Sequence, residues 1–237
     1  MTLAVALRLG RVSNLPTVWT NVLAAAALAG VSLASPALGA VVLACSVFYV
    51  GGMFLNDAFD RESDARERPE RPIPAGLVPA HEVFGAGYGL LATGLAIIAV
   101  TGTAALGTAL PGVAAAVALA AGIVLYDVRH KGNPLAPLLM GVCRVLVYVT
   151  TAATLTGTVG VAVVGWAVVL FAYLVGLTAV ARHATLGARP GLVARLIAGI
   201  ALVDGLAIAG TGQLGAAAAC VVAFGLTLAL QRWVSGT

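Results

Sequence analysis

Eight apolar runs, each about as long as a membrane-spanning helix, occupy most of this chain and leave few folds open to it. An α-helix rises 1.5 Å per residue, so about twenty apolar residues cross the ~30 Å hydrocarbon core of a bilayer. Inside that core, only helices and closed barrels satisfy their own backbone hydrogen bonds. The sequence therefore predicts an all-α fold, in which residues 1–237 form one domain, a polytopic transmembrane helix bundle of about eight or nine spans. The eight runs cover about residues 14–32, 37–56, 82–101, 108–126, 134–156, 160–180, 191–210 and 213–231.

The composition and the basic residues agree with this assignment. Hydrophobic residues make up 61% of the chain and charged residues 9%, which is too little polar surface for a water-soluble globule. All but two of the 13 Lys and Arg residues, Arg144 and Arg195, lie outside the runs and on one predicted side of the membrane. Because short cytoplasmic loops are rich in Lys and Arg, both termini are expected in the cytoplasm, with the protein in the cell membrane, the inner membrane of a bacterium. The net charge of +4 is then an orientation signal, and no nucleic-acid partner is expected.

A cluster of oxygen-bearing side chains follows the second run. On a helix advancing ~100° per residue, Asn56, Asp57, Asp60 and Asp64 fall within one stripe about 100° wide. Mg²⁺ takes oxygen ligands and is commonly held by a few carboxylates together with the oxygens of a substrate phosphate. The stripe therefore predicts a Mg²⁺ site for a diphosphate. The alternative is a solvated loop, since the charges continue in both signs from Arg61 to Arg71.

A second polar segment ends the fourth run. Tyr126, His130 and Lys131 lie there, on the same predicted side of the membrane as the acidic stripe. Cations at this point would stabilise the charge on a departing diphosphate. The alternative is an ordinary cytoplasmic loop anchored by an interfacial tyrosine.

Arg144 is the basic residue whose predicted position inside the membrane carries the largest free-energy cost. It lies ~15 Å inside the fifth run at helical rise, where an ionised side chain usually marks a site, a pathway or an ion pair. Asp204, near the middle of the seventh run, is the buried acid available to it. The sequence leaves both roles open, a structural pair with Asp204 and a role in the site.

Three segments resemble signatures of the UbiA superfamily of intramembrane prenyltransferases. They are the motif Asn56-Asp57-x-x-Asp60-x-x-x-Asp64 with the segment 71–76 after it, the segment 8–17, and the segment 126–141. The resemblance implies that Mg²⁺ bridges the aspartates and an isoprenyl diphosphate, and that the allylic C–O bond ionises within the membrane. A lipophilic acceptor, often aromatic, then captures the prenyl group, with membrane lipid around the bundle.

Site residues follow from these segments and from the resemblance. The expected metal ligands are Asn56, Asp57, Asp60 and Asp64. The expected catalytic residues are Asp60, Asp64, Lys131 and Arg144. The expected diphosphate contacts are Arg11, Asn14, Arg71, Tyr126, His130, Lys131, Arg182 and His183.

The chain departs from the superfamily in one segment. A second aspartate-rich motif is usual between spans six and seven, but residues 178–190 contain no carboxylate. Arg182 or His183 would then neutralise the diphosphate in place of a second metal ion. This pattern resembles the divergent EboC-like bacterial branch. Three functions stay open: a Mg²⁺-dependent prenyltransferase, an intramembrane terpene cyclase, and a non-catalytic isoprenoid or lipid binding or transport protein.

Overall fold

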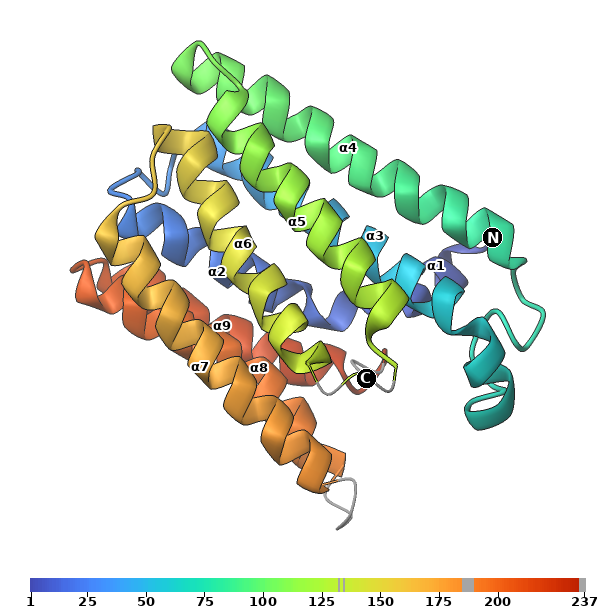
Figure 1. The fold of residues 1–237 in the computed structure, drawn as a ribbon. Coiled ribbons are helices and arrows are strands. Elements are labelled where there is room, and N and C mark those ends of the chain that lie inside the picture. The colour runs from blue at the N-terminus through green and yellow to red at the C-terminus, as the bar shows by residue number, and fades with distance from the viewer. Residues whose placement is uncertain (132, 134, 185–189, 235–237) are drawn as a thin grey trace.

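The computed structural model describes residues 1–131, 133, 135–184 and 190–234, with residues 182–184 and 190 described by their backbone alone. Within these ranges all regular secondary structure is helical, so the predicted all-α class is confirmed (Figure 1). The elements are α1 (Leu3–Leu9), the 3-10 helix η1 (Val12–Asn14), α2 (Leu15–Leu28), α3 (Pro36–Glu67), α4 (Ala80–Leu106), α5 (Leu110–Arg129), α6 (Ala136–Thr156), α7 (Val161–Ala184), α8 (Pro190–Gly210) and α9 (Leu214–Leu230).

Helices α2 to α9 match the eight predicted runs in order. Six of the described helices, α3 to α8, are long and apolar enough to cross a bilayer, and the chain is a multi-pass membrane helix bundle. Helix α2 has 14 residues and α9 has 17, so they extend about 21 and 26 Å, less than the ~30 Å hydrocarbon core. Helix α2 ends before its predicted limit because Gly30 has a φ of +73°, a left-handed conformation that terminates helices.

Helix α3 continues without a break from its apolar part through the acidic stripe. It has 32 residues, about 48 Å at helical rise, which is more than the hydrocarbon core requires. A proline in its first turn, Pro36, begins it. Because the helix continues to Glu67, residues 56–64 are helical, and the solvated-loop alternative is wrong.

Helix α2 lies between two groups of helices (Figure 1). Val18 and Val22 on α2 belong to a buried cluster with α3, α4, α5 and α6. Ala24 and Ala25, on another face of the same helix, belong to a cluster with α6, α7, α8 and α9. Small residues allow close helix contacts in membranes, and α2 thereby joins the two groups into one bundle.

Two glycines bring α4 and α5 close to α3 just before the acidic stripe. A Cβ at Gly52 would lie 2.9 Å from Ile123 of α5, and a Cβ at Gly87 of α4 would lie 2.8 Å from Leu55. Real Cβ atoms do not approach so closely. These contacts place the end of α5 beside the last turns of α3, where the site is built.

Candidate functional site

The acidic stripe forms one buried face of α3. Its four residues are 3–7% exposed, while Glu62 and Glu67 on the same helix are exposed. Glu62 points to the opposite side of the helix, whereas Glu67 has nearly the same rotational position as Asp60 and is exposed at the end of α3. The stripe comprises Asn56, Asp57, Asp60 and Asp64.

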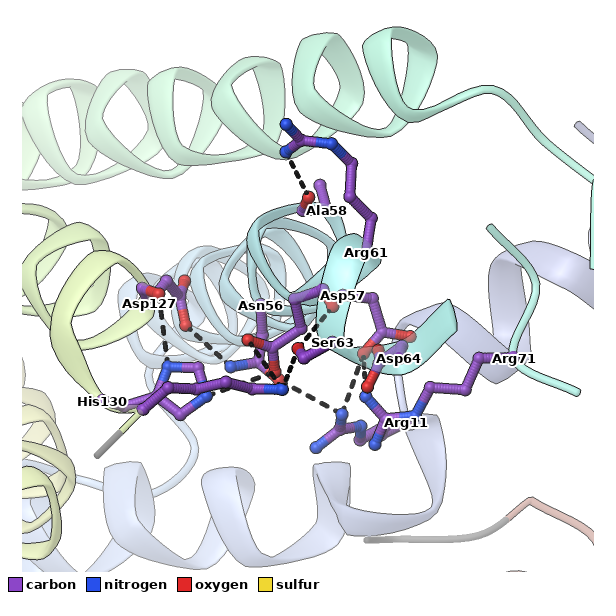
Figure 2. A network of polar contacts seen from close by, with 12 residues as sticks. Arg11, Asn56, Asp57, Ala58, Arg61, Ser63, Asp64, Arg71, Asp127 and His130 are labelled. Atoms are coloured by element: carbon purple, nitrogen blue, oxygen red, sulfur yellow. Dashed lines mark hydrogen bonds and ion pairs between the residues drawn. The ribbon is translucent and has the colours of Figure 1, made fainter. Parts of the chain in front are cut away.

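Two arginines from outside α3 pair with this face (Figure 2). Arg11 donates from Nη2 to Asp57 Oδ1 at 2.9 Å and to Asn56 Oδ1 at 3.2 Å. Arg71 donates from Nη1 to Asp64 Oδ2 at 2.7 Å and lies 3.5 Å from Asp57 Oδ1. Arg11 itself has a left-handed backbone with a φ of +42°, where the chain turns from α1 into η1. The two predicted diphosphate contacts therefore neutralise Asp57 and Asp64 in the structure.

The segment after α5 pairs with the middle of the stripe. Nε2 of His130 lies 3.2 Å from Asp60 Oδ2, and Nζ of Lys131 lies 3.7 Å from Asp60 Oδ1. Lys131 also donates a hydrogen bond to Ser63. The hydrogen bond to Asp60 raises the pKa of His130 above its ordinary value, although burial acts in the opposite direction. The ring of Tyr126 stacks on that of His130 with centroids 5.0 Å apart.

Asp127 also belongs to the cluster, although the sequence did not single it out. Its side chain is 4% exposed, and its Oδ1 accepts a hydrogen bond of 3.2 Å from Asn56 Nδ2. Its Oδ2 is buried and has no hydrogen-bond partner among the described residues. A usable signal was present in the sequence, because Asp127 is an acid at the start of an otherwise basic segment.

Two cavities adjoin this cluster, and Arg11 lines both. One, of about 350 Å³, runs between α2, α3, α5, α6, α7 and α8, with Asn14, Asn56, Asp127 and Arg144 among mostly apolar lining residues. The other, of about 380 Å³, is lined mainly by polar side chains, including Arg8, Arg68, Arg71 and Asp57. An apolar chain and a charged headgroup could thus occupy adjoining spaces.

Arg144 and Asp204 are connected through a third residue. Nη1 of Arg144 donates to Asn21 Oδ1 at 2.8 Å, and Nδ2 of Asn21 donates to Asp204 Oδ2 at 2.8 Å. Tyr148 and Thr20 each donate to Asp204 at 2.6 Å. Within the described residues no direct ion pair joins Arg144 to Asp204. The predicted direct pair is therefore wrong, because Asn21 lies between Arg144 and Asp204. Arg144 lines the apolar cavity, and its role in the site stays a prediction.

Of the remaining predicted diphosphate contacts, the structure describes the side chain of Asn14 alone. Asn14 lines the apolar cavity and accepts a hydrogen bond of 2.9 Å from Gln231. Arg182 and His183 lie in the last turn of α7, but their side chains are outside the part of the chain that the structure describes. Their role stays a prediction.

The donor types around Asn56 suit a hard cation, but their pairing differs from that of a preformed metal cage. Among the described residues, no three His, Cys, Asp or Glu side chains converge tightly enough to hold an ion alone. Asp57 and Asp64 already accept from arginines, whereas Asp127 Oδ2 is unpaired. Mg²⁺ often takes one or two carboxylates, several waters and substrate phosphate oxygens. The residues fit that mode of binding.

Comparison with known proteins places this arrangement in a family. No curated protein matches the chain. A solved structure described as digeranylgeranylglyceryl phosphate synthase in membranes has a similar fold, with a TM-score of 0.64 and 18% sequence identity. The alignment covers 97% of this chain and 87% of that one. A sequence model of the UbiA prenyltransferase family matches residues 15–236, so the chain belongs to that family.

Proposed function

We propose that the protein transfers a prenyl group from an isoprenyl diphosphate to a lipophilic acceptor within the membrane, in a Mg²⁺-dependent reaction. The observation that carries this proposal is that Arg11 lines both an apolar cavity and a polar cavity beside the buried cluster of carboxylates and cations. A prenyl diphosphate has the same two parts, an apolar chain and a polyanionic head. Family membership supports prenyl transfer as the general reaction.

The substrate occupies both spaces. The prenyl chain lies in the apolar cavity, whose walls exclude water from a carbocation formed there. The diphosphate lies at the polar end, in reach of a set of donors from four segments of the chain. These donors are Arg11, Asn14, Arg71, Tyr126, His130 and Lys131, with Arg182 and His183 as further candidates.

Bond cleavage is assisted by charge at the leaving group. As the allylic C–O bond breaks, negative charge grows on the diphosphate, and preorganised cations stabilise this charge more than they stabilise the ground state. Bound Mg²⁺ would add positive charge at the same oxygens. Asn56, Asp57, Asp60 and Asp64 are the residues proposed to hold it, and Lys131 is proposed to contact the leaving group.

Substrate binding requires the existing ion pairs to rearrange. Arg11 and Arg71 donate to Asp57 and Asp64 in the structure, so the same groups cannot serve a diphosphate and a cation without new partners. We infer that the arginines turn to the diphosphate while the aspartates turn to Mg²⁺. Such an exchange keeps each buried charge paired throughout binding, which avoids the cost of an isolated buried ion.

Arg144 is proposed to act on the acceptor side. Its guanidinium group lies 5.8 Å from the centre of the Tyr49 ring, and both residues line the apolar cavity. Asn21 and Thr17 hold the guanidinium group with neutral oxygens. It can therefore orient an electron-rich acceptor, either through a hydrogen bond or through its charge.

One experiment separates prenyl transfer from the two alternative functions. The full-length protein in liposomes is given labelled geranyl, farnesyl and geranylgeranyl diphosphates, with and without a membrane lipid extract as the source of acceptor, and diphosphate release and lipid products are measured with Mg²⁺ and with EDTA. A transferase releases diphosphate only with Mg²⁺ and only when an acceptor is present. A cyclase yields a hydrocarbon without an acceptor, and a binding or transport protein releases no diphosphate. Cytoplasmic termini in a cell membrane would place the polar cluster where soluble isoprenyl diphosphates are available.

A further inference from the structure

We propose that Asp127 is a ligand of the divalent cation, so that the metal is held between α3 and α5 and not by the α3 stripe alone. This inference rests on the metal dependence of the proposed function. Asp127 comes from α5, faces Asn56 across the helix interface and lines the apolar cavity. It is 4% exposed, and its Oδ2 has no hydrogen-bond partner among the described residues.

An unpaired carboxylate oxygen in a buried site favours a cation as its partner. Burial of a charge without a partner is costly, and buried carboxylates in proteins are paired or coordinate metals. The nearby basic groups have other partners. Arg11 donates to Asn56 and Asp57, and Lys131 forms an ion pair with Asp60. His130 contacts the backbone oxygen of Asp127 with one ring nitrogen and Asp60 with the other.

Asn56 holds the carboxylate in place for this role. Because its Oδ1 accepts from Arg11, its amide nitrogen is the group that donates to Asp127 Oδ1. One oxygen of Asp127 is thus fixed by a neutral donor, and the other stays available. A carboxylate oxygen together with phosphate oxygens and water is the ligand set that Mg²⁺ and Mn²⁺ prefer.

The test measures metal binding directly. Mn²⁺ with inorganic diphosphate is titrated into the full-length protein in nanodiscs, and bound Mn²⁺ is followed by electron paramagnetic resonance. Asp127→Asn should weaken Mn²⁺ binding at least tenfold. The control Glu62→Gln also removes one carboxylate charge near the site, from a side chain that is 81% exposed, and should change the affinity by less than twofold.

A second variant covers the case in which Asp127→Asn does not fold. Asp127→Glu keeps a carboxylate but moves it by one methylene group, so a direct ligand would alter both the Mn²⁺ affinity and the resonance spectrum. If Asp127→Asn binds Mn²⁺ within twofold of the unmodified protein, the proposal is wrong, and Asp127 is a protonated structural residue. An unchanged affinity and spectrum in Asp127→Glu would overturn it equally.

These outcomes are distinct from failure of the proposed function. If the unmodified protein turns over no prenyl diphosphate while its Mn²⁺ binding depends on Asp127, the transferase function fails and the metal ligand stands. If the protein releases diphosphate with Mg²⁺ while Asp127→Asn binds Mn²⁺ normally, the transferase function stands and the ligand is wrong.

Discussion

Replacing Asp60 by asparagine tests whether the stripe on α3 is a working site. Asp60 is 7% exposed and lies between His130 and Lys131, with separations of 3.2 and 3.7 Å. Asparagine preserves the shape of the side chain but removes its charge, so two basic groups lose the anion that faces them. It also removes one of the proposed oxygen ligands of Mg²⁺.

The size of the effect follows from the role assigned to this charge. Loss of one preorganised electrostatic group typically slows the chemical step by about 10²–10³-fold, or ~2.7–4 kcal/mol. We therefore expect Asp60→Asn to lower the initial rate of Mg²⁺-dependent diphosphate release, in liposomes supplied with the acceptor lipid extract, by about 10²-fold or more.

The matched control is Glu67→Gln. Glu67 lies on the same helix, two turns after Asp60, and its side chain is exposed. The substitution removes the same charge from the same end of α3, and the rate should stay within about threefold, since exposed charges are screened by water and salt. Equal losses in the two variants, with both proteins folded, would refute the reasoning and leave the stripe as a structural feature of α3.

Four further predictions concern other parts of the molecule. Asp204→Asn should lower the stability of the bundle in detergent by about 1–3 kcal/mol, because it leaves buried donors unpaired; an unchanged melting temperature would contradict the network. Arg71→Gln should weaken binding of a prenyl diphosphate about tenfold or more, whereas Arg61→Gln, which removes an exposed partner of a neighbouring glutamate, should not. The pKa of His130 is raised by Asp60. The stability that this pair contributes is therefore full below pH ~6.5 and is lost as pH rises through the raised pKa. The difference in melting temperature between the unmodified protein and His130→Gln should shrink across that pH interval. A reporter fused to the carboxyl terminus should be cytoplasmic, and a periplasmic signal would reverse the expected topology.

Much of the candidate site could be predicted because it depends on local periodicity. Asn56 and Asp64 are two turns apart on α3, and both are buried on the face that the 100° rotation predicted. The partners of that face could not be predicted. Arg11 meets Asp57 across 46 positions of the chain, and His130 meets Asp60 across 70, and no local rule relates residues so far apart.

Asp127 and Arg144 show the same difference between what local sequence predicts and what depends on tertiary contacts. Asp127 has a sequence neighbourhood of tyrosine and basic residues, and its contact with Asn56 depends on the packing of α5 against α3. For Arg144 the sequence identified the available acid but not the intermediate, since Asn21 of α2 lies between Arg144 and Asp204. Each of these contacts depends on the packing of α2, α3, α5 and α6 against one another.

The sequence by itself determined that the chain is a multi-pass helix bundle, where most helices begin and end, and which face of α3 carries the acids. These properties follow from hydropathy and from the helical repeat, which act over some twenty residues or fewer. Only the tertiary structure decided which cation meets which carboxylate, that Asp127 Oδ2 has no hydrogen-bond partner in the described part of the chain, and that Arg11 lines both an apolar and a polar cavity. The physical reason is that charge pairing and cavities arise between helices, and their geometry depends on side chains from several distant segments at once.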